Sequence, residues 1–258
     1  MTVWVCGNSQ SRALSKGLSA MSDVGSDVSA FVLGHAKYEL TDYSGIHNGV
    51  VTVTVEEYAK NLESSTGKPY FDKSHTWGFC QGTHNARIFR DEFWNNCDPS
   101  EVAVRQRRPI SLAILDAIIE ADQKYIKLFH RRLTETGTRC FVISCPPPRG
   151  DHPCVQSGTR LETIAYIDQR ARTLMKNHLV GLGVPFIDCP PEAATPEGLL
   201  KPEFYAPDRP GVKDAHHANP DYGLMMMHRV LDYLSSSKRN LAVDARVKHA
   251  IAVELSAA

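Results

Sequence analysis

The sequence lacks any long hydrophobic run. No apolar stretch approaches the ~20 residues that a helix needs to span a bilayer. The N-terminus also lacks a cationic segment followed by an apolar one, so no secretory signal is recognisable. The seven cysteines are odd in number and form no tightly spaced pairs, which favours free thiols over a disulfide framework. We therefore expect a cytoplasmic protein.

The chain also lacks an excess of charge of either sign. It has 29 Lys and Arg residues and 29 Asp and Glu residues, so it offers no basic surplus for nucleic acid or an anionic membrane. The Gly-x-x-x-x-Gly-Lys-[Ser/Thr] and Gly-x-Gly-x-x-Gly signatures of nucleotide sites are absent. His152 and Cys154, even with His216 and His217, lack the compact spacing of metal ligands. We predict no cofactor, no metal site, and no nucleic-acid or membrane partner.

What the sequence contains is an alternation of strands and helices. The 258 residues are 42% hydrophobic and 22% charged, as in ordinary soluble domains. Apolar runs predict strands at 3–6, 28–33, 50–55, 77–79, 139–144 and 184–188, whereas amphipathic patterns predict helices from residue 11 and at 56–61, 110–133, 161–179 and 222–234. The run at 50–55 is compatible with a core strand or an edge strand. This order predicts a mostly parallel sheet covered by helices on both faces, in one domain of residues 1–235. Residues 236–258 form an extension, helical or partly ordered.

The first strand ends in a polar turn that holds Ser9. Gly7 and Asn8 break the apolar run, and a helical pattern follows from Ser11. Such a turn places Ser9 at the carboxyl edge of the sheet, beside the first backbone N–H groups of the helix, where ligands of open α/β sheets bind. Two interpretations stand at this point. Ser9 caps the helix, or it is a nucleophile that requires a base to take its proton.

A candidate base lies near the other end of the chain, just ahead of the last predicted helix. Asp214 precedes His217 by three residues, so that one loop can carry both side chains. The carboxylate would hold the Nδ1–H of the imidazole while Nε2 faces a serine. That arrangement supplies a general base and stabilises the imidazolium that forms when the proton moves.

These blocks together resemble the SGNH (GDSL-type) hydrolases. The resemblance rests on Gly7-Asn8-Ser9, on a Gly-x-x-Asn element from Gly82 to Asn85, on Asp214-x-x-His217, and on the Val-Ile-Ser-Cys-Pro-Pro-Pro strand end at 142–148. It extends from residue 2 to about residue 234, and its specificity comes from the order and spacing of the blocks. The family resemblance implies a flavodoxin-like three-layer α/β/α sandwich with a central, mostly parallel sheet.

The resemblance also implies site residues and their roles. Ser9 would be the nucleophile, His217 the base and Asp214 the acid that orients it. Ser9 would also give its backbone N–H to the oxyanion hole, with the side-chain amide of Asn85 and a glycine as the other donors. Gly34, at the end of the second predicted strand, is chosen for this glycine over Gly45 and Gly49. Such donors are often the largest catalytic contribution, because they face the oxygen on which negative charge develops.

Three features depart from the pattern of the family. Asn8 stands where aspartate is common, which concerns the turn more than the chemistry. The Gly-Thr-His-Asn block is one residue longer than the usual Gly-x-Asn, so the match to the family is weaker at Asn85 than at Ser9. His216 competes with His217 for the role of base, and the three-residue spacing from Asp214 favours His217.

The function that this pattern predicts is ester hydrolysis through an acyl-serine intermediate. The expected partner is a small-molecule or carbohydrate ester, with a small acyl group on a carbohydrate or metabolite. One alternative is an O-acyltransferase that uses a donor such as acyl-CoA. The other is a binding module that keeps the sheet without the chemistry.

Overall fold

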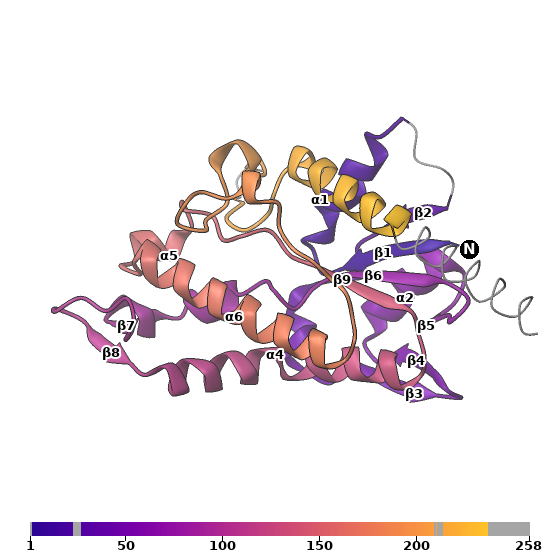
Figure 1. Cartoon of the computed structure of the whole chain (residues 1–258), viewed down its shortest axis with the longest axis horizontal. Helices are drawn as coiled ribbons and strands as arrows, with labels where there is room; N and C mark the ends of the chain where they lie inside the picture. The colour runs from indigo at the N-terminus through magenta and orange to yellow at the C-terminus, as the bar shows by residue number, and fades with distance from the viewer. Residues whose placement is uncertain (1, 23–26, 209, 211–213, 237–258) are drawn as a thin grey trace, which may run out of the picture.

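The computed structural model describes residues 2–22, 27–208, 210 and 214–236. In this part of the chain five parallel strands form a central sheet in the order β2-β1-β6-β9-β10 (Figure 1). They are β1 (Val3–Gly7), β2 (Val28–Ala30), β6 (Thr76–Cys80), β9 (Cys140–Ile143) and β10 (Phe186–Ile187). Numbered by their order in the chain, these strands are arranged 2-1-3-4-5, which is the flavodoxin-like order. The predicted fold class is therefore confirmed.

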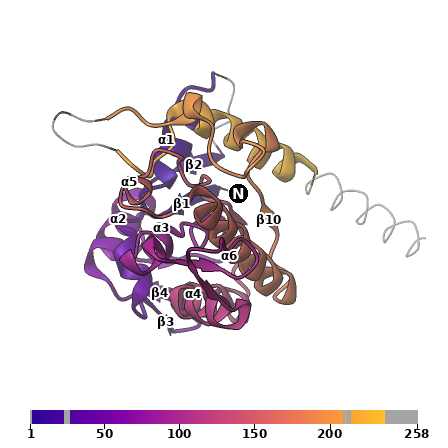
Figure 2. The same ribbon diagram turned by 90° about the vertical axis from the view of Figure 1, so that its left-hand side faces the viewer.

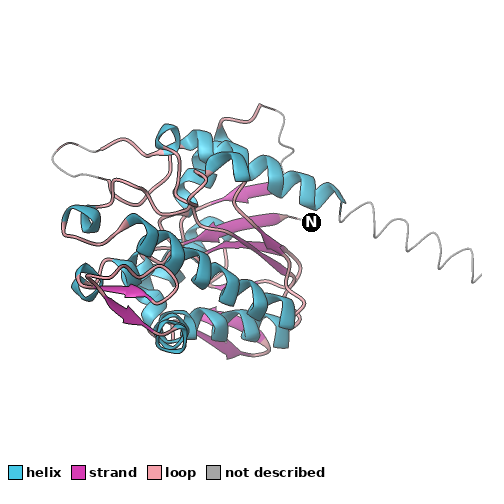
Figure 3. Cartoon of the chain, turned by 60° about the vertical axis from the view of Figure 1, so that its left-hand side comes forward, coloured by secondary structure: helices cyan, strands magenta, loops and turns pink. Residues whose placement is uncertain are grey.

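Helices cover both faces of the sheet and give three layers (Figures 1 and 3). On one face lie α1 (Ser11–Ser19) and a last helix, described from residue 220 to residue 236. On the other lie α2 (Glu56–Thr66), α4 (Leu112–Glu135) and α6 (Leu161–Gly181). The short helices are η1 (Ala36–Leu40), α3 (Ala86–Phe89), η2 (Glu92–Asn95), α5 (Pro153–Gln156), η3 (Pro191–Ala193) and η4 (Pro202–Phe204). None of the described helices is long and apolar enough to cross a membrane.

The core divides along the pleat of the sheet. Val3 and Val5 of β1 pack with α1 and the last helix, whereas Cys6 packs with α2, α4 and α6 on the opposite face. This is the alternation that a strand imposes, because successive side chains point to opposite faces. A strand buried on both faces must be apolar throughout, which explains why this run was recognisable in the sequence.

The run predicted as a strand at 50–55 does not enter the central sheet. Its residues form β4 (Val50–Val53), which pairs in antiparallel fashion with β3 (Ser44–His47) and β5 (Tyr70–Phe71) in a second sheet. A third, two-stranded sheet joins β7 (Cys97–Pro99) to β8 (Arg108–Ile110). Of the predicted extension at 236–258, all but residue 236 lies outside the described residues.

The last helix packs tightly against α1, and Figure 2 shows the two side by side. A Cβ atom at Gly223 would lie 1.8 Å from the carbonyl oxygen of Ala13, and one at Gly17 would lie 2.2 Å from backbone atoms at Gly223 and Leu224. The two helices therefore touch backbone to backbone, which only glycine allows at these positions. This contact fixes the loop before the last helix relative to the start of α1.

We expect Gly223→Ala to destabilise the protein by about 1–3 kcal/mol, the usual cost of forcing extra atoms into a packed core. The backbone of α1 cannot yield as a flexible side chain would. Gly181→Ala is the matched control, because a Cβ atom there meets nothing within 4 Å. Chemical denaturation measures both changes. A stability of Gly223→Ala equal to that of the wild type would contradict the close helix contact.

His130 on α4 is a buried histidine without a hydrogen-bond partner for either ring nitrogen in the described part of the chain. Burial, with a smaller contribution from His178, lowers the pKa of His130 to about 3. The unfolded chain takes up this proton near pH 6.5 and the folded protein does not, so stability is lost as the pH falls from about 6.5 toward 3. The loss from this one group is on the order of 2 kcal/mol at about pH 5.

We expect His130→Phe to lose less stability than the wild type between about pH 7 and pH 5, because the group that takes up the proton on unfolding is gone. Urea unfolding at both pH values measures the difference. Replacing the exposed His47 in the same way serves as the control. If His130→Phe keeps the wild-type pH slope, His130 does not cause the loss of stability in acid.

Candidate active site

The turn that carries Ser9 is held close to the neighbouring strand. β1 ends at Gly7, where a Cβ atom would lie 2.1 Å from the carbonyl oxygen of Cys80 in β6. Glycine at this position therefore allows the end of β1 to lie directly against β6 without a clash. Ser9 follows two residues later, partly exposed at the carboxyl edge of the sheet.

Asn8 fixes the conformation of this turn. Its Oδ1 accepts a hydrogen bond from the backbone N–H of Gln10 at 3.0 Å, and its carbonyl oxygen accepts one from the Ser11 hydroxyl at 2.8 Å. Helix α1 has Gln10 at its N-cap and no side-chain cap. The interpretation of Ser9 as a helix cap is therefore wrong, and its hydroxyl is free for another partner.

That partner is His217. The Nε2 atom of His217 lies 2.9 Å from Ser9 Oγ, and its Nδ1 lies 2.8 Å and 3.0 Å from the two carboxylate oxygens of Asp214. The structure thus brings together three residues that the sequence places 208 positions apart at most. Both members of the Asp-x-x-His motif lie in the loop that immediately precedes Ala218, which forms an isolated bridge with Tyr205.

Asp214 is held in its charged form. Burial would raise its pKa, but the backbone N–H of His217, the His217 ring and the backbone N–H of His216 outweigh burial and lower it. Those two N–H groups donate to Oδ1 at 3.0 Å and 3.3 Å. A carboxylate held in this way orients the imidazole and favours its protonated form when it takes a proton.

His216 makes different contacts from His217. Its Nδ1 lies 3.2 Å from Nε2 of His152, while its carbonyl oxygen accepts a hydrogen bond from the Gln10 side chain at 3.3 Å. No hydrogen bond joins it to Ser9 in the described residues. Of the two adjacent histidines, His217 is therefore the one that contacts the serine.

The predicted backbone donors have free N–H groups. Leu33 donates its backbone N–H to the carbonyl oxygen of Gly7 at 2.7 Å, which places Gly34 at the same sheet edge as the Ser9 turn. The backbone N–H groups of Ser9 and Gly34 donate to no protein group in the described part of the chain. Both are available to a bound molecule.

Asn85 is not directed toward this group of residues. Its side-chain amide donates to Asp168 Oδ1 at 2.8 Å and to the carbonyl oxygen of Thr83 at 3.2 Å. Both amide hydrogens are therefore in use, and the structure does not bring Asn85 together with the other predicted site residues. The cause is Asp168 on α6, whose buried carboxylate needs donors.

A buried polar network supports the turn from behind. The Asn8 amide donates to Glu39 Oε1 at 2.8 Å, Arg87 reaches Glu39 Oε2 at 3.2 Å, and Arg87 also holds both carboxylate oxygens of Asp122 at 2.9 Å. Burial raises the pKa of Glu39, although Arg87 and Asn8 act against it. Sequence reasoning missed these residues, because nothing in the chain marks a contact between positions 31 residues apart.

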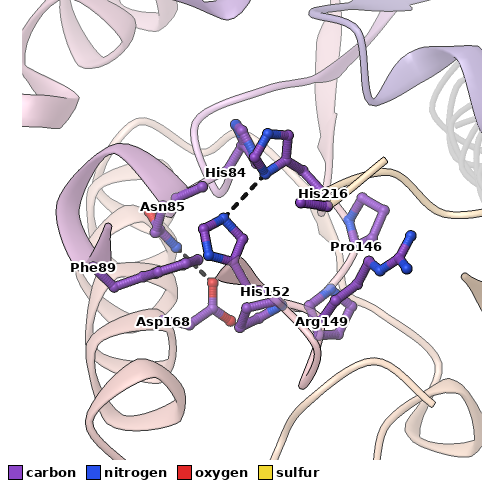
Figure 4. Close-up of a pocket in the computed structure, with 12 residues that line it drawn as sticks. His84, Asn85, Phe89, Pro146, Arg149, His152, Asp168 and His216 are labelled. Carbon is purple, nitrogen blue, oxygen red and sulfur yellow. Dashed lines mark hydrogen bonds between the residues drawn. The ribbon is translucent and has the colours of Figure 1, made fainter. Parts of the chain in front are cut away.

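A small cavity of about 10 Å³, which is room for about one water molecule, lies beside His216 (Figure 4). Three imidazoles, those of His84, His152 and His216, line it together with Phe89 of α3 and residues 146–148. The three prolines of the latter segment take the chain out of the sheet after β9, as the sequence predicted. Among the described residues no group of three or more His, Cys, Asp or Glu side chains could hold a metal ion.

No protein-family model matches the chain, and no curated protein matches its sequence. Solved structures do match. A carbohydrate acetylesterase from Sinorhizobium meliloti is 11% identical, with a TM-score of 0.47 over 92% of this chain and 99% of that chain. An extracellular lipase from Streptomyces rimosus is 15% identical, with a TM-score of 0.46 over 90% and 99%. A GDSL-like lipase from Bacteroides thetaiotaomicron is 11% identical, with a TM-score of 0.43 over 92% and 88%. Esterases and lipases of the SGNH and GDSL type are thus among the solved structures that this chain is similar to.

Proposed function

We propose that the protein is a serine esterase that hydrolyses its substrate through an acyl-serine intermediate. The observation that carries the proposal is the unbroken contact from Ser9 through His217 to Asp214, with distances of 2.9 Å and 2.8 Å. A serine hydroxyl is a weak nucleophile unless a base lies within hydrogen-bond reach and is itself oriented by a third group. Both conditions are met by His217 and Asp214.

The first half of the reaction forms the acyl-enzyme. Ser9 Oγ attacks the ester carbonyl carbon while His217 Nε2 takes the hydroxyl proton, and Asp214 stabilises the resulting imidazolium. The backbone N–H groups of Ser9 and Gly34 donate to the carbonyl oxygen as it becomes negative. Collapse of the tetrahedral intermediate breaks the bond to the alcohol, which leaves with the proton from His217.

The second half restores the serine. A water molecule occupies the place of the departed alcohol, and His217 takes one of its protons as the oxygen attacks the acyl carbon. The bond to Ser9 Oγ then breaks, and the serine regains its proton from the imidazolium. Carboxylic acid is released, and the enzyme returns to its first state.

For the substrate we propose a small acyl group carried by a carbohydrate or metabolite. The cavity beside His216 is small, at about 10 Å³, against the ~300–1,000 Å³ of sites that take drug-sized ligands. Its imidazole lining supplies polar contacts, and residues 146–148 and Phe89 supply apolar ones. Neither Ser9 nor His217 lines this cavity, and so little space beside the two residues favours a short acyl chain over a long one.

Hydrolysis of p-nitrophenyl acetate, butyrate and octanoate tests the proposal. We expect turnover to be fastest for acetate and slowest for octanoate, because the longer chain exceeds the cavity. Turnover that requires a sugar acceptor in place of water would assign the protein to the acyltransferases. No turnover of any ester, with or without an acceptor, would contradict the proposal and favour a binding module.

A further inference from the structure

His84 lies in the loop after β6, at the sheet edge that also carries Ser9. β6 pairs directly with β1, with Cys80 opposite Gly7, so the loops that follow these two strands are neighbours. The His84 ring contacts the His216 ring at a centroid distance of 5.9 Å, and the His216 ring contacts the His217 ring at 6.1 Å. His84 therefore lies near the Ser9–His217 pair, with the His216 ring between it and His217.

Both ring nitrogens of His84 are buried, and neither has a hydrogen-bond partner in the part of the chain that the structure describes. Burying polar atoms without partners is costly, and native structures do so rarely. Such a side chain at the edge of a cavity is satisfied when a ligand supplies the missing partner. Asn85, the neighbouring residue that was predicted to donate here, has both of its amide hydrogens committed elsewhere.

The hydrogen bonds of His152 and His216 determine which of their ring nitrogens carry a proton. The backbone N–H of Cys154 donates to Nδ1 of His152 at 3.2 Å, so a neutral His152 carries its proton on Nε2. That Nε2–H then donates to Nδ1 of His216 at 3.2 Å (Figure 4). The facing nitrogen of His216 is thereby used, and His216 cannot turn Nδ1 toward His84.

His84 is a neutral imidazole in this setting. Burial is the main cause of its lowered pKa, and the positive charge of Arg87 and the rings of His216 and His217 add to the effect. A neutral imidazole keeps one N–H donor, which can face an oxygen that becomes negative without surrendering its proton.

We propose that His84 supplies the side-chain hydrogen bond to the carbonyl oxygen of the ester as that oxygen becomes negative, beside the backbone N–H of Ser9. The inference rests on the proposed esterase function and goes beyond it, because it assigns to His84 the part that the sequence had predicted for Asn85. It follows that the third donor of this site is an imidazole N–H.

His84→Phe is the decisive variant, because phenylalanine keeps a planar ring in the same space and removes the donor. We expect it to fold with a stability at or above that of the wild type, since no unpartnered nitrogens remain to be buried. We expect kcat for p-nitrophenyl acetate to fall about 100- to 1,000-fold, with little change in KM, because the bond forms mainly in the transition state. His84→Asn restores a donor and is expected to recover part of the loss.

His75→Phe is the matched control. It makes the same replacement directly before the first residue of β6, at the end of the strand away from His84. There the His75 ring lies against Trp4 and Trp77. It is expected to keep the wild-type kcat. Loss of kcat in His84→Phe with recovery in His84→Asn supports the inference.

Wild-type kcat in a folded His84→Phe overturns it, as does the same loss in both His84 variants, which marks a role in packing. These outcomes are separate from a failure of the proposed function. If Ser9→Ala hydrolyses the ester as fast as the wild type, or if the wild type has no esterase activity, the proposed function fails and the inference fails with it.

Discussion

Ser9→Ala is expected to lower kcat for p-nitrophenyl acetate by about a million-fold, the loss seen when a serine hydrolase with the same three residues loses its nucleophile. The reason is that His217 and Asp214 act only through the serine hydroxyl, which lies 2.9 Å from Nε2. Without it, no acyl-enzyme can form. What activity remains comes from substrate binding and from the backbone N–H donors, which still stabilise attack by water.

The measurement is steady-state hydrolysis with circular dichroism as the check on folding. Ser19→Ala, at the exposed end of α1, makes the same change away from the site and should keep wild-type kcat. Equal rates in Ser9→Ala and the wild type would mean that another residue carries the reaction.

His217→Ala is expected to cost about as much as Ser9→Ala, and the double variant no more than either one. Residues that act as a unit in one chemical step give losses that do not add. His216→Ala is the comparison, because it removes the adjacent imidazole, which contacts His152 and not Ser9. The loss in His216→Ala should be much the smaller of the two.

The values of kcat for Ser9→Ala, His217→Ala, the double variant and His216→Ala, each compared with the wild type, show which histidine is the base. A larger loss in His216→Ala than in His217→Ala would contradict the assignment of the base. Additive losses in the double variant would show that Ser9 and His217 act in separate steps, which the geometry does not allow.

The middle strands of the central sheet, β1, β6 and β9, were predictable because they are buried on both faces. Residues 3–6 and 140–143 are apolar at every position, and the long helices alternate apolar and charged positions at helical spacing. The run at 50–55 is as β-branched as a core strand, yet it forms part of a separate antiparallel sheet. The residue types in a run predict a strand but not which strand it pairs with, so the second sheet could not be predicted.

The site was predictable where contacts are local. Asp214 and His217 lie three residues apart in one loop, so the spacing alone predicts that they pair. The end of an apolar run marks the Ser9 turn. Asn85 shows the limit. Its amide turns to Asp168, a residue 83 positions away, and no local pattern reveals that competition. The same holds for Glu39 behind Asn8, 31 positions away.

The acyl-serine mechanism is tested most directly by labelling with a fluorophosphonate, followed by peptide mapping. The reagent forms a bond from its phosphorus to a serine oxygen that a base has activated, and fluoride leaves. The account predicts one label for each chain, on the peptide that contains Ser9, with none in Ser9→Ala and much slower labelling in His217→Ala. A wild type that stays unlabelled, or a label on any other residue, would contradict it.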